Sequence, residues 1–281
     1  MSTMQEKLKK MNPRQLEAVL HTEGPLLILA GAGSGKTTVL INRIAYIIDQ
    51  SLAKPWQILA ITFTNKAAGE LKERLTAMLG DTGGDVWAAT FHSTCARILR
   101  RDGDRIGYSS HFTVYDTDDS KRLVKDCQKA LNIDDKMISH KSILSEISHA
   151  KDSMLSPADY QAAAGSDFRL AKIGAVYELY QKRLREADAM DFDDLLLQTN
   201  ILFRDHPDVL EKYRSFFQFV LVDEYQDTNF AQHLIVQRLC EVHRRICVVG
   251  DDAQSIYSFR GANIDNILQF KNQYPGCRIF K

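Results

Sequence analysis

The sequence predicts a parallel α/β fold that is interrupted by an all-helical insertion. Short unbroken apolar runs recur along the first hundred residues, and helical patterns follow them, which is the alternation typical of a parallel sheet. The 15 glycines and 6 prolines are few for 281 residues, since the two together average about 12% of a chain. This shortage favours long helices over a loop-rich β protein.

The strands of the sheet are predicted from short apolar runs, and the first of these is unbroken, as expected for a strand buried on both faces. Six such runs are found, at 26–30, 58–63, 86–91, 219–223, 246–250 and 277–280. Between the second and third runs we expect a helix that Thr64 or Asn65 caps and that Gly80 ends, because its apolar residues share one face.

The helical insertion is predicted at 113–188, where strand-like runs disappear and helical periodicity takes over. It begins with a capping sequence at Asp116, followed by an apolar stripe that includes Leu123, Cys127 and Leu131. Residues 1–112 and 189–281 then form one discontinuous domain. The last strand-like run is followed only by Lys281, from which we expect the chain to be cut from a longer protein.

The composition is that of an average globular protein, with 44% hydrophobic and 26% charged residues. No apolar run approaches the roughly 20 residues of a membrane helix, and the N-terminus lacks a signal-peptide core, so we expect a cytoplasmic protein without a membrane partner. The five cysteines are scattered and suggest neither disulfides nor a zinc site. Net charge is zero, so nucleic-acid binding has to be argued from local features.

A phosphate-binding loop is predicted between the first strand and the following helix. Glycines allow backbone N–H groups to surround a phosphate at the positive end of a helix, although the usual first glycine of the pattern is Ala30 here. Lys36 would reach the outer phosphates and Thr37 would ligate Mg²⁺. The predicted nucleotide-binding residues of this loop are Gly31, Ala32, Gly33, Ser34, Gly35, Lys36, Thr37 and Thr38.

An acidic pair follows the strand at 219–223. Asp223 would hold Mg²⁺ together with Thr37, while Glu224 would accept a proton from the attacking water or orient it. This division of roles suits hydrolysis of ATP. Two other classes stay open at this point, a nucleotide or metabolite kinase and a nucleotide-gated binding module without catalysis.

Seven ordered segments of the chain resemble the N-terminal half of superfamily 1 DNA helicases of the UvrD/Rep/PcrA type. The segments are 8–19, 30–37, 62–68, 90–93, 191–196, 223–229 and 249–262. The resemblance implies a RecA-like parallel sheet of the phosphate-loop NTPase class, and an ATP-dependent 3′-to-5′ DNA helicase or translocase that serves DNA repair or replication. It also implies ATP and Mg²⁺ as cofactors.

The resemblance implies further site residues. Gln15 is similar to a reader of the adenine edge, Gln254 to a sensor of the γ-phosphate, and Arg260 to a residue that couples this sensor to DNA. Together with Lys36, Asp223 and Glu224, the last two complete the catalytic set. The implied track for single-stranded DNA uses aromatic and short polar side chains: Phe63, Thr64, Asn65, His92, Tyr257 and Phe259. Core packing remains an alternative for Phe63 and Phe91, and a structural role for His92.

The resemblance also implies the partners of the protein and a catalytic arginine that these 281 residues lack. Expected partners are single-stranded DNA, 3′-tailed duplex DNA, a C-terminal RecA-like domain of the same chain and an accessory loading protein. No segment matches the arginine that such a second domain supplies, so we expect the isolated 281 residues to be weak or inactive. Two positions depart from the family pattern, Phe259 where many members have Trp and Thr38 where an adenine-packing Arg is expected.

Overall fold

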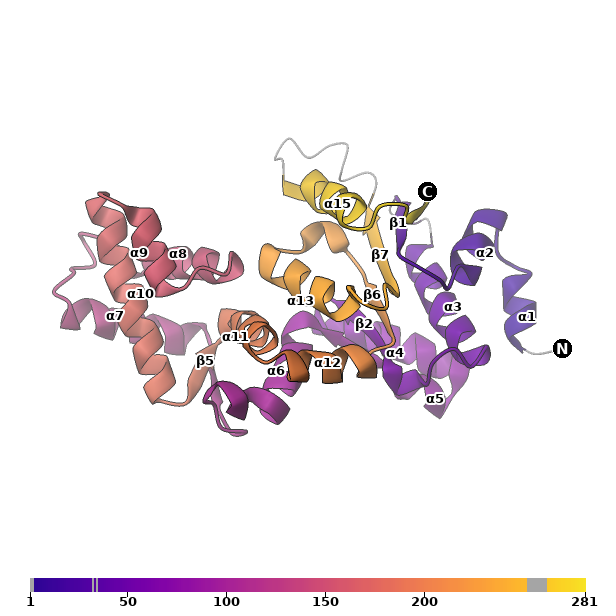
Figure 1. Cartoon of the computed structure of the whole chain (residues 1–281), viewed down its shortest axis with the longest axis horizontal. Coiled ribbons are helices and arrows are strands. Elements are labelled where there is room, and N and C mark those ends of the chain that lie inside the picture. Colours follow the sequence, from indigo (N-terminus) through magenta and orange to yellow (C-terminus); the bar gives the residue numbers. More distant parts are fainter. Residues whose placement is uncertain (1–2, 32, 34, 252–261) are drawn as a thin grey trace. The chain divides into compact units, whose positions relative to one another are not determined.

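The computed structural model describes residues 3–31, 33, 35–251 and 262–281 (Figure 1). It forms two compact units. The first comprises Met1–Phe91, Glu211–Thr228 and Val236–Lys281, and the second comprises His92–Leu210 and Asn229–Ile235. Among the described helices, none has the length and apolar character needed to cross a membrane.

The first unit is built on a six-stranded parallel sheet with the order β3-β2-β6-β7-β1-β8. Its strands are β1 (Leu26–Ala30), β2 (Ile58–Thr62), β3 (Trp87–Thr90), β6 (Phe219–Val222), β7 (Ile246–Asp251) and β8 (Arg278–Phe280). All six strands lie within a residue or two of the predicted runs. For the buried strands the reason is that burial on both faces leaves continuous apolar sequence, whereas β8 is an edge strand with Arg278 and Ile279 exposed. The predicted parallel α/β class is therefore confirmed.

Helices and short 3-10 turns precede and connect the strands of this unit. They are α1 (Thr3–Leu8), α2 (Pro13–Leu20), α3 (Lys36–Asp49), η1 (Pro55–Gln57), α4 (Asn65–Leu79), α5 (Asp81–Gly84), η3 (Tyr225–Asp227) and α15 (Ala262–Gln273). Apolar residues of α2, α3 and α4 form one buried core with the sheet. The predicted ends of α4 are confirmed: the Thr64 hydroxyl accepts a hydrogen bond from the Ala67 N–H at 3.0 Å, and Gly80 is the C-cap with φ of 68°.

The second unit is mostly helical. Its elements are α6 (Phe91–Asp102), η2 (Gly103–Ile106), β4 (Thr113–Tyr115), α7 (Thr117–Ala130), α8 (His140–Asp152), α9 (Pro157–Ala164), α10 (Phe168–Glu186), β5 (Ala189–Asp191) and α11 (Phe192–Asp205). Helices α12 (Pro207–Phe216) and α13 (Phe230–Cys240) contain residues of both units. The predicted cap of α7 is confirmed, since the Asp116 carboxylate accepts from the Asp119 N–H.

The insertion is not entirely helical, which corrects the prediction for 113–188. Strand β4 occupies the first three residues of that range and pairs in parallel with β5, directly after its end. Three residues are too few to show strand periodicity, so neither strand has a recognisable signal in the sequence. The pairing brings the two ends of the predicted insertion side by side, and the compact unit around it extends further, from His92 to Leu210.

Candidate ATP site and DNA-binding residues

The predicted phosphate loop joins β1 to the start of α3. Gly33 and Gly35 have φ of 76° and 82°, in the left-handed region that glycine adopts without steric cost. Helix α3 has no side-chain cap at its N-terminus, where the first N–H groups of a helix attract anions. Ala32 and Ser34 lie outside the described residues.

Lys36 and Thr37 form the first turn of α3. The Lys36 side chain is 13% exposed, and its Nζ lies 3.8 Å from Oδ2 of Asp251. Asp251 ends β7, and its backbone pairs with Ala30 at the end of β1. Sequence reasoning assigned no role to Asp251, although it follows a buried apolar run as Asp223 does, and that position was the available signal.

The acidic pair follows β6 at the same edge of the sheet. The Asp223 N–H donates to the carbonyl of Ile61, and the Asp223 carboxylate accepts from the N–H of Glu224 at 2.9 Å. Burial, and then the charge of Glu224, raises the pKa of Asp223. Glu224 has φ of 49°, which is uncommon for a residue with a Cβ and is found preferentially at functional sites.

This donor set fits Mg²⁺ bound together with a nucleotide. Within the described part of the chain, no group of three or more His, Cys, Asp or Glu side chains could hold a metal ion. Mg²⁺ commonly uses one or two carboxylates, and phosphate oxygens and waters complete its shell. Asp223 and the Thr37 hydroxyl suit that role, and the raised pKa of Asp223 shows a buried carboxylate that a cation would stabilise.

A cavity of about 180 Å³ adjoins Lys36 and lies against α2. Gln15 lines it and also caps α2, since its Oε1 accepts from the N–H of Asn12 at 3.2 Å. Its Nε2 lies 3.2 Å from the position that a Cβ on Gly35 would take, so a larger residue there would crowd Gln15. Sequence reasoning missed Arg14 and Phe280, which also line this cavity.

The side chain of Thr38 contacts helix α4 in the structure. Its hydroxyl accepts a hydrogen bond at 3.1 Å from Nη2 of Arg74, an exposed residue of α4. A guanidinium therefore lies beside position 38 although the residue there is threonine. This contact joins residues 36 positions apart, and only the fold could reveal it.

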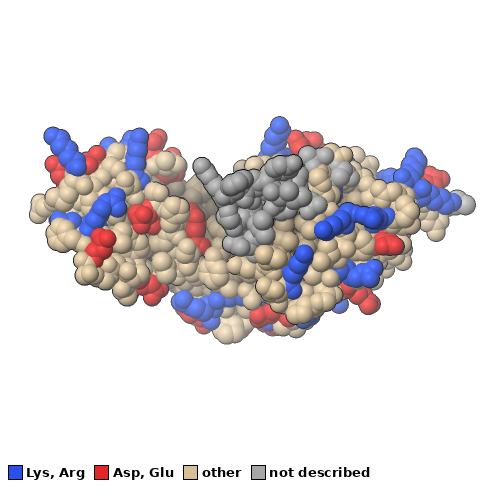
Figure 2. Space-filling view, turned by 90° about the horizontal axis from the view of Figure 1, so that it is seen from above, with Lys and Arg blue, Asp and Glu red and all other residues tan. Residues whose placement is uncertain are grey.

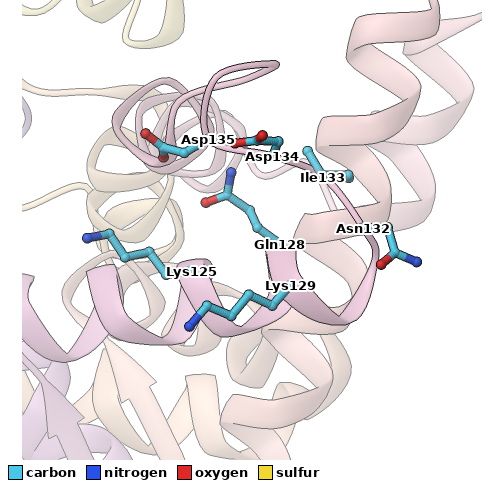
Figure 3. A pocket seen from close by; sticks show the side chains of 7 residues that line it. All are labelled: Lys125, Gln128, Lys129, Asn132, Ile133, Asp134 and Asp135. Carbon is cyan, nitrogen blue, oxygen red and sulfur yellow. The ribbon is translucent and has the colours of Figure 1, made fainter.

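A larger cavity, of about 620 Å³, lies in the second unit. Among the side chains that line it, Gln128 lies between Lys125 and Lys129 of α7 on one side and Asp134 and Asp135 on the other (Figure 3). None of the predicted site residues lines it, and its lining carries no motif for nucleotide chemistry.

The predicted DNA residues of the first unit are only partly exposed. Phe63 is half-buried and its ring centroid lies 5.6 Å from that of Phe91, which is a core residue at 2% exposure. The alternative of core packing therefore holds for Phe91. Thr64 and Asn65 are exposed at the start of α4.

In the second unit, His92 is half-buried, and burial lowers its pKa. Its ring centroid lies 5.3 Å from that of Phe192, which is 54% exposed. Sequence reasoning gave Phe192 no role, although an exposed aromatic inside a matched segment was a usable signal. Besides Ala32 and Ser34, four further predicted residues fall outside the described part of the chain: Gln254, Tyr257, Phe259 and Arg260.

On the face shown in Figure 2, lysine and arginine side chains are interspersed with aspartate and glutamate side chains. This distribution agrees with the net charge of zero.

Comparisons with known proteins agree with this geometry. Residues 11–275 match the family described as "UvrD/REP helicase N-terminal domain". The chain is 50% identical over 268 residues to the ATP-dependent DNA helicase PcrA of Staphylococcus aureus (strain Mu50 / ATCC 700699), and 49% identical over 271 residues to that of Staphylococcus epidermidis (strain ATCC 12228 / FDA PCI 1200). These alignments cover 95% and 96% of the chain and 37% of each relative. The chain belongs to the UvrD/REP helicase N-terminal domain family, with its RecA-like α/β fold.

Proposed function

We propose that this chain is the ATP-binding part of a 3′-to-5′ DNA helicase that couples hydrolysis of Mg-ATP to movement along single-stranded DNA. The observation that carries the proposal is the meeting of four groups at the carboxyl ends of neighbouring parallel strands. Lys36, Asp223, Glu224 and Asp251 all follow or end such strands, where open α/β sheets bind their ligands. Direction and a place in repair or replication rest on the resemblance.

Each residue at the strand ends would have one task. The N–H groups at the start of α3 and the Lys36 ammonium bind phosphate oxygens. Lys36 is held only loosely by Asp251, at 3.8 Å, so it can turn to a phosphate. Asp223 and Thr37 hold Mg²⁺, which when bound neutralises charge on the phosphate oxygens. Glu224 accepts a proton from water.

The nucleotide base would occupy the cavity between α2 and the phosphate loop. Gln15 lines this cavity and can donate from Nε2 to the base edge. Arg74 brings its guanidinium to Thr38 and so supplies a planar cation, which packs well on a ring system, near the place where the family has arginine.

The resemblance assigns Phe63, Thr64, Asn65 and His92 to the binding of single-stranded DNA, and Phe192 would add an exposed aromatic face beside His92. Aromatic faces bind bases without reading their sequence, and short polar groups hold the backbone. Tyr257 and Phe259 are assigned to the same track by the resemblance, as are Gln254 to γ-phosphate sensing and Arg260 to its coupling with DNA. A second RecA-like domain and a loading protein are proposed partners on the same basis.

The division between binding and hydrolysis is testable with two variants of the protein as its gene encodes it. Lys36→Ala should weaken binding of Mg-ATP about tenfold or more, since it removes a charged hydrogen-bond donor worth about 1.5–3 kcal/mol. Glu224→Gln should keep nucleotide binding and lower kcat about 100-fold or more, because a general base contributes about 10²–10⁴ in rate. Fluorescent-nucleotide titration and phosphate release measure the two effects.

Lys72→Ala, an exposed lysine of α4, is the matched control and should behave as wild type. If Glu224→Gln releases phosphate as fast as wild type, the assigned role of that carboxylate is wrong. Phosphate transfer to an acceptor without release would identify a kinase, and nucleotide binding without turnover would identify a binding module.

A further inference from the structure

Gln226 lies directly behind the proposed catalytic carboxylate, in η3. The residue is 1% exposed. Its Nε2 donates to Oε2 of Glu224 at 2.5 Å, and its Oε1 accepts from the backbone N–H of Asp251 at 3.3 Å. The Gln226 carbonyl in turn accepts from Nδ2 of Asn266 on α15 at 2.9 Å. One buried amide therefore joins the loop after β6 to the end of β7.

Space and chemistry both restrict this position. A Cβ on Gly250 would lie 3.4 Å from Oε1 of Gln226, so the strand passes close to the amide. A primary amide can donate to a carboxylate from its nitrogen and accept from a backbone N–H at its oxygen at the same time. A buried amide without such partners would cost free energy, and here both ends are used.

The contact has a consequence for Glu224. Its backbone is fixed in the left-handed region, with φ of 49°, but this leaves the side-chain torsions undetermined. The bond from Gln226 occupies Oε2 and so fixes the carboxylate plane, which leaves Oε1 to accept a proton. Positioning a catalytic group in this way contributes to rate without contributing to substrate affinity.

We propose that Gln226 is a positioning residue for ATP hydrolysis, which holds the Glu224 carboxylate in its working orientation and ties it to the end of β7. The proposal rests on the proposed function of Glu224. Because Asp251 also faces Lys36, the network Glu224–Gln226–Asp251–Lys36 joins the group that activates water to the group that binds phosphate.

Two variants distinguish the two hydrogen bonds of the Gln226 side-chain amide, and both are made in the protein as its gene encodes it. Gln226→Leu removes both contacts, whereas Gln226→Glu keeps an oxygen that accepts from Asp251 and loses the donor to Glu224. Both should lower kcat for ATP about tenfold or more, and both should leave KM for ATP and the affinity for a nonhydrolysable ATP analogue within about twofold. Gln198→Leu is the control, since Gln198 is a buried glutamine of α11 in the other unit whose Oε1 has no hydrogen-bond partner in the described structure.

A double-mutant cycle with Glu224→Gln gives the readout that a purely structural role would not produce. If Gln226 acts through Glu224, adding Gln226→Leu to Glu224→Gln should change the residual single-turnover rate less than twofold. The proposal for Gln226 would be overturned if Gln226→Leu lowered the rate by the same factor in wild type and in Glu224→Gln. It would also be overturned if both Gln226 variants kept the wild-type kcat while Glu224→Gln was inactive. Neither result would affect the proposed function of Glu224. Wild-type turnover in Glu224→Gln would overturn the proposed function of Glu224, and the role of Gln226 with it.

Discussion

Carboxylates outside the ATP site differ in pKa because their neighbours differ. Asp191 is buried, which favours the protonated form, but Lys151 and the hydroxyl of Tyr180 outweigh burial and lower its pKa. For Asp152, burial and then the charge of Asp193 raise the pKa to about 6. The charge of His149 acts in the opposite direction and is too weak to reverse this.

Asp152 therefore gives a pH-dependent stability with a defined sign. Its pKa is higher in the folded chain than in the unfolded chain, so its stabilising contribution is complete below about pH 4. This contribution is lost as the pH rises through about 6. Asp152→Asn, which stays neutral, should have a higher Tm than wild type at pH 8 and a similar Tm at pH 4.5. Thermal melts at both pH values measure this.

Asp126→Asn is the matched control for that measurement, since Asp126 is an exposed aspartate of α7. It should shift Tm equally at both pH values. A lower Tm for Asp152→Asn than for wild type at pH 8 would show that the Asp152 carboxylate has a favourable partner there.

At the scale of elements, one lysine holds three elements of the second unit together. Lys151 of α8 has a side chain with 0% exposure, and its Nζ lies 2.7 Å from Asp191 and 3.0 Å from Asp194. The two aspartates form the capping box that starts α11, and Tyr180 of α10 donates to Asp191 at 2.8 Å. Although burial opposes it, the charge of the two aspartates raises the pKa of Lys151, so the lysine stays charged.

Lys151→Met should destabilise this unit by about 3–5 kcal/mol, because it leaves two buried carboxylates without their cation. Urea unfolding followed by circular dichroism measures the loss. Lys125→Met, at an exposed position of α7, is the control and should lower the free energy of unfolding by less than about 0.5 kcal/mol. Adding Asp191→Asn to Lys151→Met should restore part of the lost free energy of unfolding. If Lys151→Met lowered that free energy by less than about 1 kcal/mol, the ion pair would not be what holds these elements together.

The elements that the sequence predicted are those with long local signals. Strand β1 was predicted at its observed bounds, and α4 with both of its caps, since apolar runs, hydroxyl caps and glycine stops act over a few residues. Strands β4 and β5 were missed because pairing, not local sequence, makes three residues a strand. The contacts of Lys151 could not be predicted from local sequence either, since they join residues 40 and 43 positions apart.

At the scale of the whole molecule, the order of the sheet assembles the candidate site. Strands β2, β6, β7 and β1 are neighbours, so the residues after them meet although they are separated by up to about two hundred positions. The motifs indicated candidate residues for this site, because phosphate loops and acidic strand ends have local patterns. Gln226, Asp251 and Arg74 were not predicted, because their roles depend on neighbours that only the strand order supplies.

The chain spans 37% of the length of the relatives that it matches, so coupling to DNA is a property to test in the protein as its gene encodes it. The most direct measurement is the rate of phosphate release from Mg-ATP with and without single-stranded DNA. We predict that saturating single-stranded DNA raises kcat severalfold in wild type and not in Glu224→Gln. An unchanged rate of phosphate release in wild type, with DNA binding verified in the same samples, would contradict a DNA-driven ATPase.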